Sequence, residues 1–254
     1  MTTALITGAT AGIGAEFARQ LAARGDDLVI VARDTVRLGR AAAALQHEFG
    51  VKVEAIPADL LSAEGLAAVD TRLADRRRPI DLLVNNAGYG IRGELDENSV
   101  EDEKLHLDIH VTVPLQLTQT ALRGMLERGR GRIVLISSVA AFTPRGTYSA
   151  AKAWSVMFAR GANLVYRGRG VSVTAVCPGF VRTEFHDRMK VGTAGIPEFL
   201  WLQAPTLVRL ALRGIDRGRA VVIPTVRYRV IAALARVLPD RLGTAGRFSS
   251  RDGD

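Results

Sequence analysis

Tyr148 and Lys152 are the residues whose types and spacing most plainly suggest chemistry. They lie four residues apart in the stretch YSAAK, within a run that reads as helix. Residues at this spacing share one helix face, so the phenol and the ammonium can point into one cleft. A free tyrosine has a pKa of about 10, and a nearby cation lowers it because the cation favours phenolate. The pair therefore predicts part of an acid–base site.

A glycine-rich turn, TGATAGIG at 7–14, is the second candidate. It follows an apolar run and opens a helical pattern. Glycines allow a tight turn and a close approach of backbone to a pyrophosphate, and the helix N-terminus attracts negative charge. The spacing excludes a P-loop, which ends in Gly-Lys-Ser/Thr. We predict that a dinucleotide binds against Gly8, Thr10, Gly12, Ile13 and Gly14.

The end of the second apolar run bears on which dinucleotide binds. An NAD site usually carries an acid there for the ribose hydroxyls, whereas this sequence has Ala32 followed by Arg33. A guanidinium suits a 2′-phosphate by charge and by its forked geometry. Asp34 argues weakly against this, although it can equally cap the next helix. We predict NADP(H), with Arg33 on the 2′-phosphate.

The elements that must position these groups follow from the apolar pattern. Short, continuous apolar runs occur at 4–7, 28–32, 53–56, 81–85, 132–137, 171–176 and 220–224. Continuous rather than alternating runs indicate strands covered on both faces, and helical patterns separate them, such as the one ending near Gly25. We predict an α/β fold, a Rossmann-type doubly wound parallel sheet in a single domain. Ligands bind beyond the carboxyl ends of such strands.

We place the catalytic domain at 1–239, with a substrate loop at about 184–204 and a flexible tail at 240–254. The net charge of +8 comes from 34 Lys and Arg residues spread along the chain, with few aromatics among them, so we expect no nucleic-acid partner. The one cysteine, Cys177, excludes an internal disulfide, and no Cys and His cluster predicts a metal. The N-terminus resembles neither a signal peptide nor a membrane span, and we expect a cytoplasmic protein.

Five motifs in order resemble the short-chain dehydrogenases/reductases of about 250 residues: TGATAGIG at 7–14, ADL at 58–60, NNAG at 85–88, YSAAK at 148–152 and PGFVRT at 178–183. The resemblance implies further cofactor contacts. Asp59 and Leu60 would meet the adenine, although Asp59 could instead cap a helix. The adenosine side would pack on Asn85, Ala87 and Gly88, and the nicotinamide end on Pro178, Gly179 and Thr183.

The resemblance also implies the catalytic roles. Tyr148 would protonate the carbonyl oxygen while the cofactor delivers hydride, and Lys152 would bind the nicotinamide ribose and lower the Tyr148 pKa. Ser138 would hydrogen-bond the substrate oxygen, and one of Ser137 and Ser138 should turn inward. Ser138 and Tyr148 are ten residues apart, three fewer than is usual in the family, which puts the shape of the substrate pocket in doubt.

A histidine, His110, stands where the family has an asparagine that organises a proton relay. It could titrate in that relay or be a structural replacement. The other histidines, at 47, 106 and 186, are assigned to the surface or to packing, and Cys177 is assigned to packing.

The substrate region is rich in large apolar residues, namely Phe142, Phe180, Phe185, Met189, Phe199, Leu200 and Trp201. They suggest a hydrophobic carbonyl substrate, or they close the core. A basic amphipathic segment at 227–238 resembles that of actinobacterial family members that reduce keto-lipids. We expect it to pack on its own subunit or a neighbour, with membrane-surface contact as the alternative. The family resemblance implies a homodimer or homotetramer.

The sequence thus predicts an NADPH-dependent oxidoreductase that reduces a hydrophobic ketone or keto-acyl lipid to a secondary alcohol, with Tyr148 as general acid. The alternatives are the reverse reaction, as a secondary-alcohol dehydrogenase, and a non-catalytic NADP-binding regulatory protein.

Overall fold

A single parallel sheet forms the centre of the protein. A computed structural model describes residues 2–91, 93–144, 146–183 and 197–235. The seven strands lie in the order β3-β2-β1-β4-β5-β6-β7, and every neighbouring pair is parallel. The strands are β1 Thr3–Thr7, β2 Asp27–Ala32, β3 Val53–Pro57, β4 Leu82–Asn85, β5 Gly131–Ile136, β6 Val171–Val176 and β7 Val221–Val222. The predicted doubly wound sheet is confirmed.

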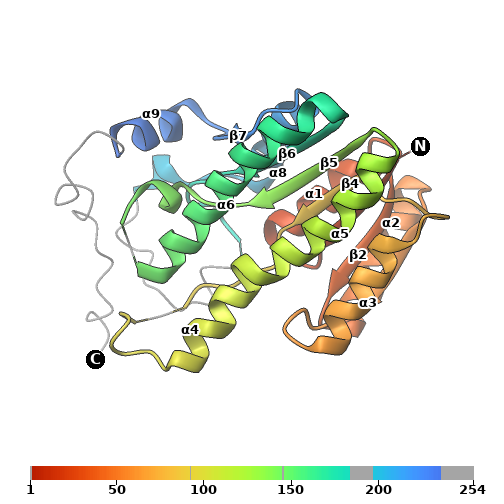
Figure 1. Cartoon of the computed structure of the whole chain (residues 1–254), viewed down its shortest axis with the longest axis horizontal. Coiled ribbons are helices and arrows are strands. Elements are labelled where there is room, and N and C mark those ends of the chain that lie inside the picture. The colour runs from red at the N-terminus through yellow and green to blue at the C-terminus, as the bar shows by residue number, and fades with distance from the viewer. Residues whose placement is uncertain (1, 92, 145, 184–196, 236–254) are drawn as a thin grey trace.

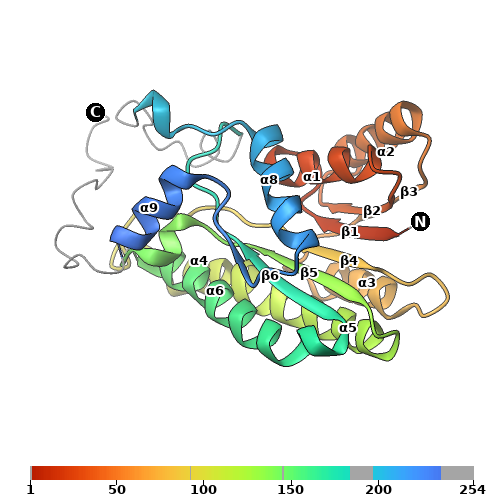
Figure 2. The ribbon, with the colours of Figure 1, turned by 90° about the horizontal axis from the view of Figure 1, so that it is seen from above.

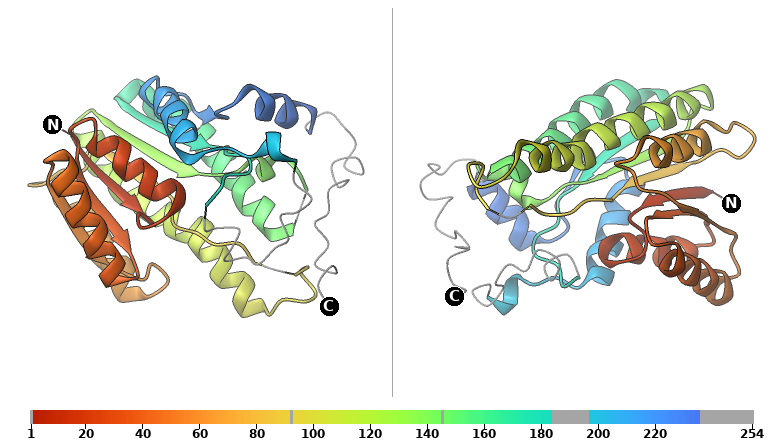
Figure 3. Two further views of the ribbon diagram at one scale, coloured as in Figure 1. Left: turned by 180° about the vertical axis from the view of Figure 1, so that it is seen from behind. Right: turned by 90° about the horizontal axis from the view of Figure 1, so that it is seen from below.

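Helices cover both faces of the sheet (Figures 1 and 2). On one face lie α1 Gly12–Ala22, α2 Thr35–Phe49 and α8 Ala204–Asp216, and on the other α3 Ala63–Ala74, α5 Val113–Glu127 and α6 Gly146–Tyr166. The views from behind and below in Figure 3 show the same two layers. Each layer buries its own apolar core against the sheet. This explains why the strands read as continuous apolar runs.

Three consecutive helical segments form one long helix with an irregular turn in it. The helix α4 Val100–Leu107 continues through the π-helical segment η1 Asp108–Thr112 into α5, as Figure 1 shows. The short helices are η2 Val139–Phe142, η3 Arg167–Arg169 and η4 Glu198–Leu200, and α9 Val226–Leu234 follows β7. No described helix has the length and apolar character needed to cross a membrane.

The helix ends refine several predictions. Asp34 caps α2, because its carboxylate accepts a hydrogen bond from the backbone N–H of Arg37 at 2.9 Å. Ser62, rather than Asp59, caps α3. The first helix ends at Ala22 with Ala23 as its C-cap, and Gly25, expected near the cap, follows with a φ of +82°. The strand predicted at 220–224 is only two residues long.

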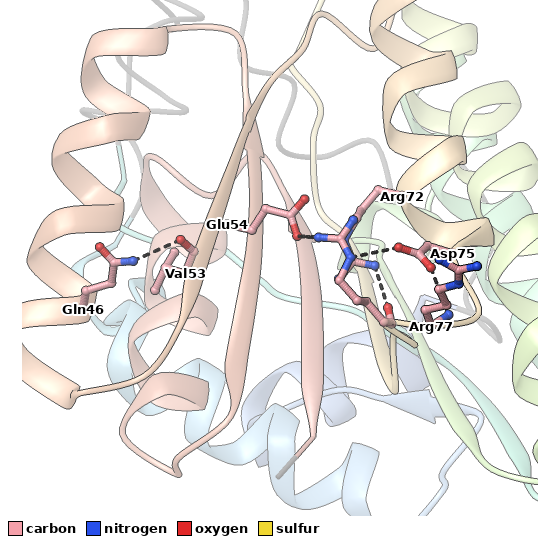
Figure 4. Close-up of polar contacts among 7 residues, drawn as sticks. Gln46, Val53, Glu54, Arg72, Asp75 and Arg77 are labelled. Atoms are coloured by element: carbon pink, nitrogen blue, oxygen red, sulfur yellow. Dashed lines mark hydrogen bonds and ion pairs between the residues drawn. The ribbon is translucent and has the colours of Figure 1, made fainter.

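A charged cluster attaches the outer strand β3 to α3 (Figure 4). The Arg72 side chain is 6% exposed, and its Nε donates to the Glu54 carboxylate at 2.8 Å. Arg78 donates to the same carboxylate at 3.1 Å and to Asp75 at 2.9 Å. Arg76 pairs with Glu127. Arg72, Arg76 and Arg78 therefore all pair with acids of their own chain.

Candidate active site

The glycine turn after β1 forms a backbone cradle. Gly8 and Gly12 have φ values of +66° and +54°, which side-chain-bearing residues rarely adopt. A Cβ on Gly14 would lie 2.2 Å from the carbonyl oxygen of Gly8. The residue before α1, Ala11, offers no side-chain cap, and the first turn of α1 holds no acid. The N–H groups of this helix terminus can therefore serve an anion, so the turn fits a dinucleotide pyrophosphate.

Two residues that the sequence analysis did not assign hold this turn. The Thr7 hydroxyl accepts hydrogen bonds from the backbone N–H groups of Asn86 and Ala87 at 2.9 and 3.0 Å. The Asn86 amide in turn donates to the carbonyl oxygens of Thr7 and Gly8 at 2.9 and 3.1 Å. Both residues stand inside the quoted motifs TGATAGIG and NNAG. Their pairing across β1 and β4 was the missing information.

The ends of β2 and β3 lie on the same side. Arg33 is exposed, and the Asp59 carboxylate accepts from the N–H of Leu61 at 3.1 Å. Burial raises the pKa of the Tyr89 phenol, the Arg33 charge lowers it and the Asp59 charge raises it. Residues following β2, β3 and β4 therefore lie near one another, and Leu60, which follows Asp59, is buried.

The NNAG segment at 85–88 fixes the carboxyl end of β4 to the neighbouring helical segments. The Asn85 side chain is buried and donates to the Thr118 hydroxyl of α5 at 3.1 Å, which fixes the end of β4 to that helix. Gly88 gives room to His110, because a Cβ at position 88 would lie 2.3 Å from the His110 ring.

Lys152 and Tyr148 lie together on α6, as their spacing predicts. The Lys152 ammonium is buried, donates to the carbonyl oxygen of Ile136 at 2.8 Å and lies 5.5 Å from the centre of the Tyr148 ring. Burial lowers the pKa of Lys152 to about 8, while an electrostatic interaction with Cys177 opposes the shift.

Ser138 contacts Tyr148 despite the short connection between them. Burial raises the pKa of Tyr148 to about 12, and a hydrogen bond with the Ser138 side chain lowers it. The Tyr148 pKa was expected to be lowered, but it is raised, because the effect of burial is larger than the effect of the hydrogen bond with Ser138. Ser137 is buried and its hydroxyl donates to the Lys152 carbonyl oxygen at 2.8 Å, so Ser138 is the serine beside the Tyr148 phenol. The shortened connection folds as η2, which starts directly after Ser138.

His110 lies in the π-helical segment η1, a kind of irregularity that often marks functional sites. Its Nε2 lies 2.7 Å from the Tyr89 carbonyl oxygen, and its ring centre lies 5.6 Å from that of Tyr148. Burial places the pKa of His110 well below its ordinary value, and the Lys152 charge lowers it further. His106, assigned to surface or packing, is fully buried 5.9 Å from the Tyr148 ring centre.

The loop after β6 closes the site. Thr183 packs against Gly12 of the glycine turn, since a Cβ on Gly12 would lie 3.1 Å from the Thr183 side chain. The Pro178 carbonyl oxygen accepts from the N–H of Val139 at 2.8 Å, which ties the loop to the Ser138 segment.

Tyr228 of α9 braces this loop, and the sequence analysis missed it. A Cβ on Gly179 would fall within 2.0 Å of the Tyr228 ring. The Tyr228 hydroxyl accepts from the N–H of Phe180 at 3.0 Å and donates to the carbonyl oxygen of Leu200 at 2.7 Å. The helix α9 therefore packs on its own chain through Tyr228 and Ala232.

Aromatic side chains gather near this loop. The Phe180 and Trp201 ring centres lie 5.9 Å apart, and the Arg182 guanidinium lies over Trp201 at 5.2 Å. Phe199 is exposed and Phe142 is half-buried. Most of the predicted substrate loop lies outside the described residues. The same holds for two of the apolar residues expected near the substrate, Phe185 and Met189, and for His186.

The fold and site define an α/β protein with a glycine-rich backbone cradle, which fits a dinucleotide, and a Ser–Tyr–Lys group. The short chain dehydrogenase family matches residues 2–192. A ketoacyl reductase, HetN, from Nostoc sp. is 36% identical over 184 residues, 70% of this chain and 63% of its own length. The chain thus spans less than two thirds of that relative.

Two solved structures are similar over nearly the whole chain. A short-chain dehydrogenase from Sphingobium yanoikuyae in complex with NADPH is 36% identical with a TM-score of 0.85, covering 100% of this chain and 99% of that one. A bulky-bulky ketone specific alcohol dehydrogenase from Comamonas testosteroni is 34% identical with a TM-score of 0.81, covering 97% and 95%. The chain belongs to the short-chain dehydrogenase family and is an oxidoreductase of that family.

Proposed function

We propose that this protein is an NADPH-dependent reductase that converts a hydrophobic ketone or keto-acyl compound to a secondary alcohol. The observation that carries the proposal is the meeting of Ser138 with Tyr148 above the buried ammonium of Lys152. One hydroxyl can hold a carbonyl oxygen while the other protonates it.

Bound NADPH supplies the hydride. The backbone cradle of Gly8, Gly12 and Gly14 would hold its pyrophosphate, with Thr10 and Ile13 completing the turn. Arg33 would bind the 2′-phosphate, a role favoured by its exposed position and by Ala32 in place of an acid. The relative from Sphingobium yanoikuyae, with NADPH bound, supports this choice.

The remaining cofactor contacts follow the arrangement of strand ends. Asp59 and Leu60 would contact the adenine, and Asn85, Ala87 and Gly88 would shape the adenosine side. At the other end Pro178, Gly179 and Thr183 would hold the nicotinamide, and Thr183 already packs on Gly12 of the glycine turn. Lys152 and Tyr148 would bind the nicotinamide ribose.

Tyr148 is the general acid of this proposal. With a pKa of about 12, the phenol carries its proton at neutral pH and can give it to the substrate oxygen. Lys152, with a pKa of about 8, is a cation at neutral pH and stabilises the phenolate that remains. Ser138 hydrogen-bonds the oxygen as negative charge develops on it.

The substrate class rests on Phe180 and Trp201 beside the loop after β6. The printed names of two relatives, a ketoacyl reductase and a bulky-bulky ketone specific dehydrogenase, agree with a large apolar carbonyl compound. The graded test is NADPH oxidation by the purified protein with ketones and β-keto-acyl esters of increasing chain length. Turnover that rises with length supports the proposal, and NADPH binding without turnover of any carbonyl favours the regulatory alternative.

The assembly we propose is a cytoplasmic homodimer or homotetramer formed through α5 and α6. These helices expose Leu115, Met157, Leu164 and Val165, which is unusual apolar exposure for an uncovered face. Light scattering of the wild-type protein and of Leu164→Glu would test it, and an unchanged mass would exclude this surface.

The opposite reaction direction uses the same residues. With Tyr148 as base, the site would oxidise a secondary alcohol, and the cellular ratio of oxidised to reduced cofactor would set the direction. The equilibrium position measured with both cofactor forms distinguishes the two.

A further inference from the structure

Two buried histidines lie against Tyr148. They come from the rod formed by α4 and η1, and the ring centres of His106 and His110 are 4.6 Å apart. The His106 and His110 ring centres lie 5.9 and 5.6 Å from that of Tyr148. His106 is 0% exposed and His110 is 3% exposed. Both rings are therefore in contact distance of the general acid and are shielded from bulk water.

The ring nitrogens of this pair are poorly satisfied. Among the residues that the structure describes, both nitrogens of His106 and Nδ1 of His110 are buried without a hydrogen-bond partner. His110 Nε2 meets the Tyr89 carbonyl oxygen at 2.7 Å, so Nε2 carries the hydrogen and Nδ1 is an acceptor. Leaving a buried polar group unpaired costs about 1–3 kcal/mol, and an apolar side chain would pack here without that cost. The pair thus calls for a role beyond packing.

A carboxylate continues the line of titratable groups toward the surface. Glu103 precedes His106 by one helical turn on α4 and is 9% exposed. One oxygen accepts from the Asn98 amide at 2.9 Å, and the other is buried without a partner among the described residues. Burial lowers the pKa of His106 and is the largest effect; the Glu103 charge raises this pKa, the Lys152 charge lowers it, and an interaction with the backbone of Tyr89 raises it. His106 therefore has Glu103 on its own helix, Tyr148 and Lys152 on α6, and the rings of His110 and Tyr89 nearby.

We propose that His106 relays to Tyr148 the proton that the general acid gives up in each turnover, receiving it from Glu103, while His110 acts as a positioning residue for the His106 ring. This relay rests on the proposed function of Tyr148. It adds to the site a histidine and a carboxylate that the sequence did not single out.

The proton count balances in three steps. The Tyr148 O–H bond breaks as the O–H bond of the product alcohol forms. An N–H bond of His106 then breaks as the Tyr148 O–H bond re-forms. The Glu103 carboxylate takes up a proton from solvent, and this O–H bond breaks as an N–H bond forms on the other His106 nitrogen. A flip of the His106 ring restores its starting tautomer, so each carbonyl reduced takes up one proton from solvent.

His106→Leu tests the relay through turnover. We expect kcat to fall by about tenfold or more, because positioned proton transfer contributes at least that much, while NADPH affinity stays within about twofold. Thermal stability should be unchanged or raised, since an unpaired buried polar ring is removed. Added imidazole should restore turnover to His106→Ala. The matched control is His47→Leu, which removes an exposed histidine of α2. An unchanged kcat in His106→Leu would overturn the relay.

A second readout needs no substrate. NMR saturation transfer from water measures how fast the ring hydrogens of His106 exchange. The relay predicts exchange faster than turnover in the wild-type protein although the ring is fully buried, and at least about tenfold slower exchange in Glu103→Gln. Equal and slow exchange in both proteins would contradict the relay. Fast, Glu103-dependent exchange without turnover of any carbonyl would refute the proposed function and leave the relay standing. Full turnover in His106→Leu would refute the relay and leave the proposed function standing.

Discussion

His110 occupies its place beside Tyr148 because residue 88 is glycine. A Cβ at position 88 would lie 2.3 Å from Cε1 of the His110 ring, and the neighbouring ring atom Nε2 lies 2.7 Å from the Tyr89 carbonyl oxygen. The ring cannot move aside without breaking this hydrogen bond. The two motif positions therefore form one packed unit.

Gly88→Ala should destabilise the protein only when His110 is present. We expect a loss of about 1–3 kcal/mol in the free energy of unfolding, because the added methyl group overpacks a buried ring. In a His110→Asn background the smaller side chain gives room, so the same substitution should cost much less. Urea unfolding of the four proteins measures this coupling. Equal costs in both backgrounds would show that the two residues do not compete for space.

Arg33→Ala should weaken NADPH far more than NADH. Losing a hydrogen-bonded charge partner costs about 1.5–3 kcal/mol, so Kd for NADPH should rise roughly tenfold or more. NADH lacks the 2′-phosphate, and its Kd should change by less than about twofold. Fluorescence titration with both cofactors measures the difference. Arg40→Ala, which removes an exposed arginine of α2, is the control, and equal losses for both cofactors would rule out the 2′-phosphate contact.

Tyr228→Phe should loosen the loop after β6. The substitution keeps the ring against Gly179 but removes the hydroxyl that joins Phe180 to Leu200. We expect a loss of about 1–3 kcal/mol in the free energy of unfolding and a higher KM for the carbonyl substrate. Chemical denaturation and steady-state kinetics measure both effects. Tyr166→Phe at the end of α6 is the matched control. If Tyr228→Phe changed stability and KM no more than Tyr166→Phe does, the Tyr228 hydroxyl would not stabilise the loop.

Lys152→Met should raise stability at neutral pH while it abolishes turnover. The pKa of Lys152 is lowered from 10.5 to about 8, so folding disfavours its charged form. Between these values the unfolded chain binds more protons than the folded one, and the free energy of unfolding rises with pH through that window. The penalty is therefore fully present below about pH 8. A neutral side chain avoids it, although the carbonyl oxygen of Ile136 loses its donor, and we expect a net gain of about 1–2 kcal/mol.

Thermal unfolding at pH 7 and pH 10 measures this change. The gain of Lys152→Met over the wild-type protein should shrink at the higher pH, where the wild-type lysine is neutral when folded. A variant that is less stable at both pH values would contradict the burial penalty. In the wild-type protein, turnover should also decline as pH rises through about 8, because Lys152 loses its charge.

The sheet was predictable because its signals are local. Parallel strands covered on both faces must be apolar throughout, and the runs at 4–7 and 28–32 became β1 and β2 with little change in their limits. The last strand was overestimated: the run at 220–224 is apolar, but only Val221 and Val222 pair with β6.

The motif residues of the site could be predicted from the sequence, whereas the residues that pack against them could not. Tyr148 and Lys152 meet because their spacing within one helix requires it. His106 gave no comparable signal: its contact with Tyr148 joins α4 to α6, and a π-helical segment has no sequence marker that the analysis could use. Tyr228 lies 48 residues from Phe180, so only the fold brings its hydroxyl to that loop.

NADPH oxidation by the wild-type protein and by Tyr148→Phe, at saturating cofactor and ketone, decides whether Tyr148 is the general acid. The phenylalanine variant should lose at least about a hundredfold in kcat, since it cannot protonate the carbonyl oxygen, while its Kd for NADPH stays within about twofold. Turnover within about tenfold of wild type in Tyr148→Phe would contradict the assignment of Tyr148 as the general acid.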